Sequence, residues 1–85
     1  MLNAEGTPVS QRVRAVVART FALDPSQISE DSGIGNPPAW DSFGHMQLVA
    51  AVEEEFGIQF PSYKLSELLD VKTLSVEVQS RLAGK

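Results

Sequence analysis

The 85-residue chain contains no cysteine and a single histidine. Without cysteine there is no disulfide framework, no thiolate metal site and no cysteine nucleophile. With one histidine, a zinc site would have to consist almost wholly of carboxylates, so we expect no metal site. Metal-thiolate chemistry and cysteine catalysis are therefore excluded.

Long apolar runs and excess basic charge are also missing. The first nine residues lack the apolar core of a signal peptide, and no run approaches membrane-spanning length. We therefore expect one soluble, cytoplasmic domain over residues 1–85, with no membrane span. Eleven acidic and seven basic side chains give a net charge of −4, which argues against nucleic-acid partners. Mild acidity permits partners with basic docking patches, or it simply keeps a small monomer soluble.

The first helix is expected from Pro8 to Thr20. Residues 1–7 carry no pattern and are expected to be flexible, except that Thr7 can serve as N-cap with proline at the first helical position. Apolar residues then recur at helical spacing. They are Val9, Val13, Val16, Val17 and Phe21.

Residues 22–41 form a long connection rich in the turn formers glycine and proline. Loops of about twenty residues are uncommon inside a small domain and are usually functional or flexible. Isolated apolar residues are expected to pin this loop across the helices. They are Leu23, Ile28, Ile34 and Trp40.

A second helix is expected from Ser42 to Phe56, because Asp41 and Ser42 are good N-cap residues and Gly57 is typical just past a helix end. Residues Leu65–Asp70 predict one or two further helical turns. We expect Thr73 to cap a last helix, whose apolar residues recur every four positions. These residues are Leu74, Val78 and Leu82.

No alternating apolar run is long enough to demand a sheet. The sequence therefore predicts an all-α fold. We expect a small antiparallel bundle of three main helices plus one short helix, with a long loop between helices one and two.

The second helix carries two apolar stripes at about 100° per residue. One is expected to face the core and consists of Leu48, Val49, Val52 and Phe56. The other is flanked by polar side chains and is either a partner-binding patch or core covered by the loop. The candidate partner-binding residues are Phe43, Met46, Gln47, Ala50, Glu53 and Glu54.

Ser42 begins this helix, where the helix dipole would stabilise an attached phosphate. From the residues alone, it is either a plain helix cap or a modification site. His45 lies one turn further on, but catalysis would need it to contact the serine oxygen and be oriented by a third group. We therefore interpret His45 as a packed or loop-contacting residue.

The motif Trp40-Asp41-Ser42-Phe43, followed by a helix that ends in Glu-Glu-Glu-Phe-Gly-Ile, resembles the acyl carrier protein family. The similarity extends over almost the whole chain, including the long first loop and the short third helix. It implies that Ser42 receives 4′-phosphopantetheine from coenzyme A through a phosphopantetheinyl transferase, with Asp41 assisting. The arm's thiol then holds cargo as a thioester, which explains the missing cysteine, and the carrier itself catalyses nothing.

The resemblance also implies an acyl- or aminoacyl-loading ligase and a downstream acyltransferase or synthase as partners. Phe43 replaces the family's usual leucine, while Gly44 and Gln47 replace residues that are often acidic. We therefore expect a specialised biosynthetic pathway rather than general fatty-acid synthesis. Peptidyl, aminoacyl and D-alanyl carriers are alternatives, and so is an unmodified helical interaction domain.

Overall fold

A computed structural model describes residues 8–84. They form helices α1 (Val9–Thr20), α2 (Ser42–Phe56) and α3 (Val71–Ala83), and the short 3₁₀ helices η2 (Pro25–Gln27) and η3 (Ser62–Lys64). Strand-like pairing in this range is limited to isolated bridges. The all-α prediction is confirmed. None of the helices in the described range is long and apolar enough to cross a membrane.

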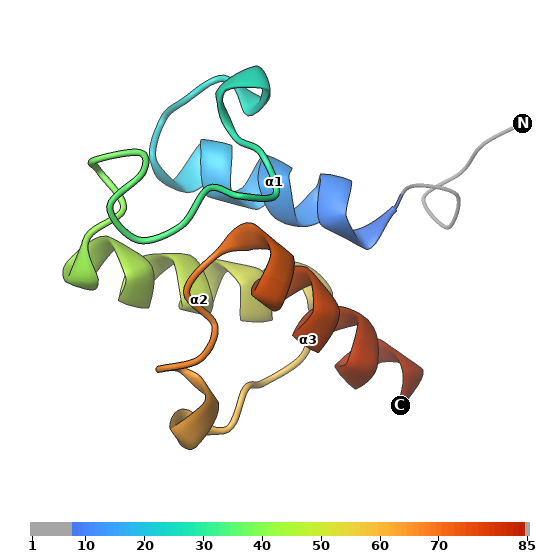
Figure 1. The fold of residues 1–85 in the computed structure, drawn as a ribbon. Coiled ribbons are helices and arrows are strands. Elements are labelled where there is room, and N and C mark those ends of the chain that lie inside the picture. The colour runs from blue at the N-terminus through green and yellow to red at the C-terminus, as the bar shows by residue number, and fades with distance from the viewer. Residues whose placement is uncertain (1–7, 85) are drawn as a thin grey trace, which may run out of the picture.

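Helix α1 packs against both α2 and α3, and α2 runs back antiparallel to it (Figure 1). The helix begins one residue later than predicted, after Pro8, and no side chain within residues 8–84 caps it. The expected Thr7 cap and the expected flexibility of residues 1–7 lie outside the described residues. The apolar stripe of α1 is buried as predicted, with Val13, Val16 and Val17 all at the centre of the core.

The core stripe of α2 is confirmed, and its ends are those the sequence predicts. Gly57 takes a left-handed conformation with φ 65°, which glycine adopts without steric cost, and its amide closes the helix on the carbonyl of Glu53. The buried residues of the stripe are Leu48, Val49, Val52 and Phe56.

Two predictions about the C-terminal third are wrong. The short helix does not lie at Leu65–Asp70 but earlier, at η3, directly after Pro61. Proline suits the start of such a helix because it has no amide hydrogen to leave unpaired. Helix α3 is capped by Asp70 rather than Thr73: the Asp70 carboxylate accepts from the Thr73 amide at 2.7 Å, and the Thr73 hydroxyl accepts from the Asp70 amide.

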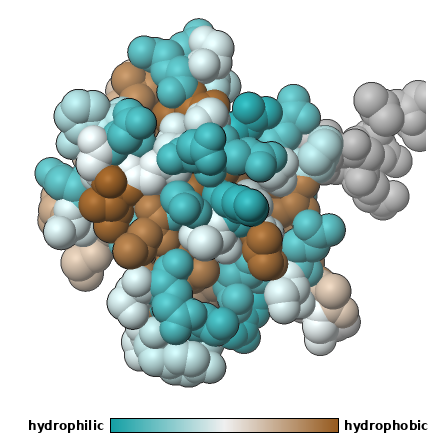
Figure 2. All heavy atoms as spheres, in the orientation of Figure 1, coloured by the Kyte–Doolittle hydropathy of each residue, from teal (hydrophilic) through white to brown (hydrophobic). Residues whose placement is uncertain are grey.

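Backbone hydrogen bonds join the long loop to Leu69 and to the start of α3. The Ile34 amide donates to the Leu69 carbonyl at 3.0 Å, and the Val71 amide donates to the Ser32 carbonyl at 2.9 Å. Figure 2 shows apolar atoms gathered on the left of the view, where this loop and that segment meet. Ile34 is therefore not the buried anchor we expected, because its side chain is exposed.

The other expected anchors behave as predicted. Trp40 and Ile28 are fully buried, and Leu23 packs partly buried against the core. Trp40 lies immediately before the start of α2, so its burial fixes the end of the loop to the helix that follows. The buried Trp40 thus fixes the position of Asp41 and Ser42, which follow it on the surface.

Candidate functional site

Asp41 is the N-cap of α2. Its backbone is extended, and its carboxylate accepts a hydrogen bond from the Gly44 amide at 2.8 Å. Its carbonyl accepts from the His45 amide at 2.7 Å. These are the contacts expected of a capping aspartate. Because the Asp41 side chain caps the helix, the Ser42 side chain is not needed as a cap.

Ser42 is the first residue of α2 and is exposed. Within residues 8–84 its hydroxyl makes no hydrogen bond. The amides of the first helical turn lack partners inside the helix, and the dipole is positive at this end. An exposed hydroxyl beside such amides fits a group attached through a phosphate.

An aromatic cluster lies directly behind the serine. The Trp40 indole N–H donates to Nδ1 of His45 at 3.0 Å, and the two rings lie edge to edge, with an interplanar angle of 18° and centroids 6.0 Å apart. Phe21, at the end of α1, also packs against the indole, with ring centroids 5.9 Å apart. The cluster therefore joins α1, the end of the long loop and the first turn of α2.

His45 is buried, as expected of a packing residue. Neither of its ring nitrogens bonds to the Ser42 hydroxyl in the described structure. Nδ1 accepts from Trp40, while Nε2 is buried near the Leu65 carbonyl without forming a hydrogen bond of good geometry. Burial lowers the pKa of His45, and the Leu65 carbonyl partly opposes that shift. The imidazole is therefore neutral, and it makes no hydrogen bond to Ser42 in the described structure. The geometry of a serine–histidine pair is missing.

The second stripe of α2 lies on the surface. Phe43 is 70% exposed and Met46 is 71% exposed, so the loop does not cover them. The alternative that these two side chains belong to the core is excluded. The exposed neighbours on the same helix are Gln47, Ala50 and Glu54.

Gly44, in contrast, faces inward. A Cβ atom at this position would lie 2.7 Å from Cε1 of Phe21 and 2.8 Å from the Ala39 carbonyl. Only glycine lets the loop approach this first turn so closely. The absence of an acidic residue here therefore removes no charge from the exposed face, which corrects the interpretation made from the sequence.

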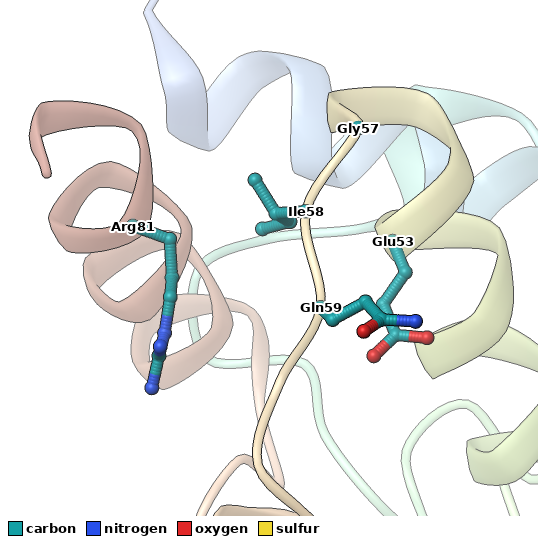
Figure 3. Close-up of a pocket in the computed structure, with 5 residues that line it drawn as sticks. All are labelled: Glu53, Gly57, Ile58, Gln59 and Arg81. Carbon is teal, nitrogen blue, oxygen red and sulfur yellow. The ribbon is translucent and has the colours of Figure 1, made fainter. Parts of the chain in front are cut away.

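The other end of α2 borders a surface pocket of about 480 Å³. Glu53 from α2 and Arg81 from α3 lie on either side of the connector residues Ile58 and Gln59 (Figure 3). The Glu53 carboxylate accepts from the Phe60 amide at 2.8 Å, so this half-buried side chain holds the connector. The pocket lies at the opposite end of the helix from Ser42 and shares no residue with the serine's surroundings.

Acidic and histidine side chains do not gather into a group that could hold a metal ion within the described range. The N-terminus of α2 combines an exposed hydroxyl, the Ser42 and Phe43 amides without a partner among the described residues, and an exposed apolar face. Sequence reasoning placed Ser42 at the start of this helix and separated Phe43 and Met46 from its buried stripe. It missed the Trp40–His45 hydrogen bond, because helical periodicity says nothing about a contact between a loop residue and a helix residue.

Comparison with known proteins defines the class. The family model described as "Phosphopantetheine attachment site" matches residues 11–77. The chain is 31% identical over 72 residues to an acyl carrier protein of Campylobacter hominis, which covers 85% of this chain and 91% of that protein. It is 30% identical over 76 residues to one of Guillardia theta and 25% identical over 76 residues to one of Thermosynechococcus vestitus, each covering 89% of this chain and 94% of the relative.

The chain therefore belongs to the acyl carrier protein family, and its function is that of an acyl carrier. The cofactor of this family is 4′-phosphopantetheine. The exposed Ser42 hydroxyl and the neighbouring Ser42 and Phe43 amides fit that group. Family members of this kind work with transferases and synthases as partners.

Proposed function

We propose that the 4′-phosphopantetheine arm is attached to Ser42. One observation supports the proposal most directly. Asp41 caps α2, so the Ser42 hydroxyl is exposed and has no partner in the described structure. The phosphate of the arm then lies beside the Ser42 and Phe43 amides, which have no partner among the described residues, and is stabilised by them and by the helix dipole.

The attachment step transfers phosphopantetheine from coenzyme A. The Ser42 oxygen forms a bond to the phosphorus of the pantetheine phosphate, the phosphoanhydride bond to 3′,5′-ADP breaks, and the serine proton is lost. A phosphopantetheinyl transferase provides the catalysis, and the Asp41 carboxylate next to the serine assists it. The arm supplies the thiol that this cysteine-free chain lacks.

The chain itself is a carrier and not an enzyme in this proposal. It presents a thioester to a loading ligase and then to an acyltransferase or synthase. The docking face, named here for its position beside Ser42, consists of Phe43, Met46, Gln47, Ala50, Glu53 and Glu54. Support comes from the exposure of its apolar members, since an apolar patch rimmed by polar side chains is typical of a binding surface.

We further propose a single-domain, monomeric, cytoplasmic carrier in a specialised pathway. The support for a specialised role is the docking face, where a phenylalanine and a glutamine stand at positions that often carry leucine and an acidic residue. Aminoacyl, D-alanyl and peptidyl carriers are the alternative cargo classes. An unmodified interaction domain is the alternative from another functional class.

The test is intact-mass spectrometry after incubation with coenzyme A and a broad-specificity phosphopantetheinyl transferase. The wild-type chain should gain one phosphopantetheine. Ser42→Ala should gain none. Ser62→Ala is the matched control, because Ser62 is also an exposed serine at the first position of a helix, and it should be modified like the wild type.

An unmodified wild-type chain would refute the carrier proposal and favour the interaction domain. Modification of Ser42→Ala would place the arm on another side chain. A further check concerns the docking face: Met46→Glu should slow modification while the circular dichroism of the helices stays unchanged, because the Met46 side chain is exposed.

A further inference from the structure

Trp40 forms a hydrogen bond with each of its polar groups. Its amide donates to the Pro37 carbonyl at 2.9 Å, and its carbonyl accepts from the Gly35 amide at 2.8 Å, so these bonds lie within the long loop. The indole N–H donates to Nδ1 of His45 at 3.0 Å. The side chain is completely buried. Trp40 is therefore firmly held in the loop and is bonded from there to the first turn of α2.

The indole bond joins two parts of the molecule directly. Among the described residues it is the only hydrogen bond between loop residues 22–40 and helix α2. Because it joins Trp40 to His45, it closes the chain between them into a ring that contains Asp41 and Ser42. The serine thus lies inside a short loop of chain whose two ends are bonded to each other.

The orientation of Ser42 depends on this ring. The Ser42 hydroxyl is exposed and makes no hydrogen bond within the described range. The backbone before it is fixed by Asp41, whose amide donates to the Ala39 carbonyl at 3.0 Å and whose carbonyl accepts from the His45 amide at 2.7 Å. Neighbouring residues, rather than contacts of its own side chain, therefore set the direction of the serine.

Apolar packing behind the ring does not replace the hydrogen bond. Phe21 packs against the indole with ring centroids 5.9 Å apart, and a Cβ at Gly44 would lie 2.7 Å from Cε1 of Phe21. Such contacts limit how closely the groups approach. A hydrogen bond also limits the angle between them, because it weakens steeply away from linearity. The bond from Trp40 to His45 therefore adds a direction that the apolar contacts lack.

We propose that Trp40 is a positioning residue for the attachment of the arm. Through its bond to His45 it holds the Ser42 hydroxyl in the direction that the transferase needs for attack on the phosphorus of coenzyme A. The inference rests on the proposed function, because it assumes that the arm is attached to Ser42. Its physical basis is that misalignment of an attacking atom slows the chemical step strongly, even when binding is unchanged.

The experiment measures single-turnover modification by an excess of a broad-specificity phosphopantetheinyl transferase with saturating coenzyme A, which separates the chemical step from binding. Trp40→Phe keeps an aromatic ring but removes the donor. We expect its limiting rate constant to fall about tenfold, and the half-saturating transferase concentration to change less than about twofold, because the docking face is unaltered. His45→Asn keeps an acceptor for the indole and should retain the rate constant within about threefold of the wild type.

A double variant separates positioning from stability. Trp40→Phe alone leaves the buried Nδ1 of His45 without a donor. Combining Trp40→Phe with His45→Leu replaces both partners by apolar groups and should recover much of the lost stability in urea denaturation. The hydrogen bond is still absent from this chain. We therefore expect the limiting rate constant of the double variant to stay about tenfold below that of the wild type.

Val78→Ala is the matched control for a loss of stability. Val78 is a completely buried residue of α3, and its truncation weakens the core without removing either partner of the Trp40–His45 bond. The assay is run at a temperature at which urea denaturation shows every variant to be folded. Under these conditions Val78→Ala should be modified at the wild-type rate.

Three results would overturn the inference. One is a wild-type rate constant for Trp40→Phe. Another is a rate constant that recovers together with stability in the double variant. The third is an equal loss of rate in Val78→Ala, since the rate would then follow stability. Each of these, together with normal modification of the wild-type chain, leaves the proposed function standing, whereas an unmodified wild-type chain refutes both.

Discussion

The indole N–H of Trp40 donates to Nδ1 of His45 across 3.0 Å, and both side chains are buried. Because Nδ1 accepts this bond, the ring proton of the neutral imidazole is assigned to Nε2. The bond connects the end of the long loop to the first turn of α2, on either side of Asp41 and Ser42. The serine is therefore held between two residues that are fixed to each other.

Trp40→Phe tests the strength of this connection. The substitution keeps an aromatic ring but removes the donor, which leaves the buried Nδ1 of His45 without a partner. We expect the free energy of unfolding to fall by about 1–3 kcal/mol, as measured by urea denaturation. An unchanged free energy of unfolding would show that the hydrogen bond contributes nothing. Since Trp40 is the only tryptophan, the change must be followed by circular dichroism in this variant.

Acidification tests the protonation state of His45. Burial lowers the pKa of His45 in the folded state, whereas the unfolded chain has the ordinary value of about 6.5. The unfolded chain therefore binds the proton first, and the stability that His45 provides is present above about pH 6.5 and is lost as the pH falls through the lower folded-state pKa. Thermal midpoints measured from about pH 7.5 down to about pH 5.5 should decrease.

His45→Asn is the control for this effect. Asparagine can still accept from the Trp40 indole but does not titrate in this range. The decrease in thermal midpoint should be smaller in the variant than in the wild type. Equal pH dependence in the two chains would assign the effect to carboxylates instead.

Two substitutions of Asp41 distinguish its role as a helix cap from a role of its negative charge. Asp41→Ala removes the acceptor of the Gly44 amide and should lower the free energy of unfolding by about 1 kcal/mol. Asp41→Asn keeps an acceptor, so its stability should stay within a few tenths of a kcal/mol of the wild type. If the carboxylate itself assists the transferase, Asp41→Asn should nevertheless be modified more slowly in the mass assay. Equal modification rates for Asp41→Asn and the wild type would limit Asp41 to capping.

Gly44→Ala tests the close approach of the loop. Alanine is the better helix former by about 1 kcal/mol, so propensity alone predicts stabilisation. The added Cβ would lie 2.7 Å from Phe21 and 2.8 Å from the Ala39 carbonyl, so we expect a net loss of about 1–3 kcal/mol. Ala50→Gly, at an exposed position of the same helix, measures the propensity term by itself. A more stable Gly44→Ala variant would contradict the packing described here.

The features predictable from the sequence are those that depend on local periodicity and capping. Helix α2 and its buried stripe follow from a repeat of about 3.6 residues and from Asp41 and Gly57 at its ends. The repeat also separates Phe43 and Met46 from that stripe, but it left open whether the loop covers them, and only the structure shows that they are exposed. The expectation that Ser42 is an attachment point came from the resemblance to the acyl carrier protein family, because its place at the start of the helix is equally compatible with a plain cap.

The features that sequence reasoning missed depend on contacts between distant segments. Ile34 is exposed because the loop is held by its backbone rather than by that side chain. Asp70 caps α3 because its backbone is already extended where it pairs with Gly33. The inward position of Gly44 likewise depends on Phe21 and the Ala39 carbonyl, neither of which is in its own helix.

The pairing of the long loop with the segment before α3 also sets an order of events during synthesis. The Ile34 amide and the Ser32 carbonyl find their partners only after Leu69 and Val71 have left the ribosome, well after Ser42 has emerged. In a nascent chain that ends before Leu69, Ser42 is therefore present while the neighbouring loop still lacks these two hydrogen bonds. In the finished protein, the amide hydrogens of Ile34 and Val71 should exchange with solvent deuterium together, because opening the loop frees both.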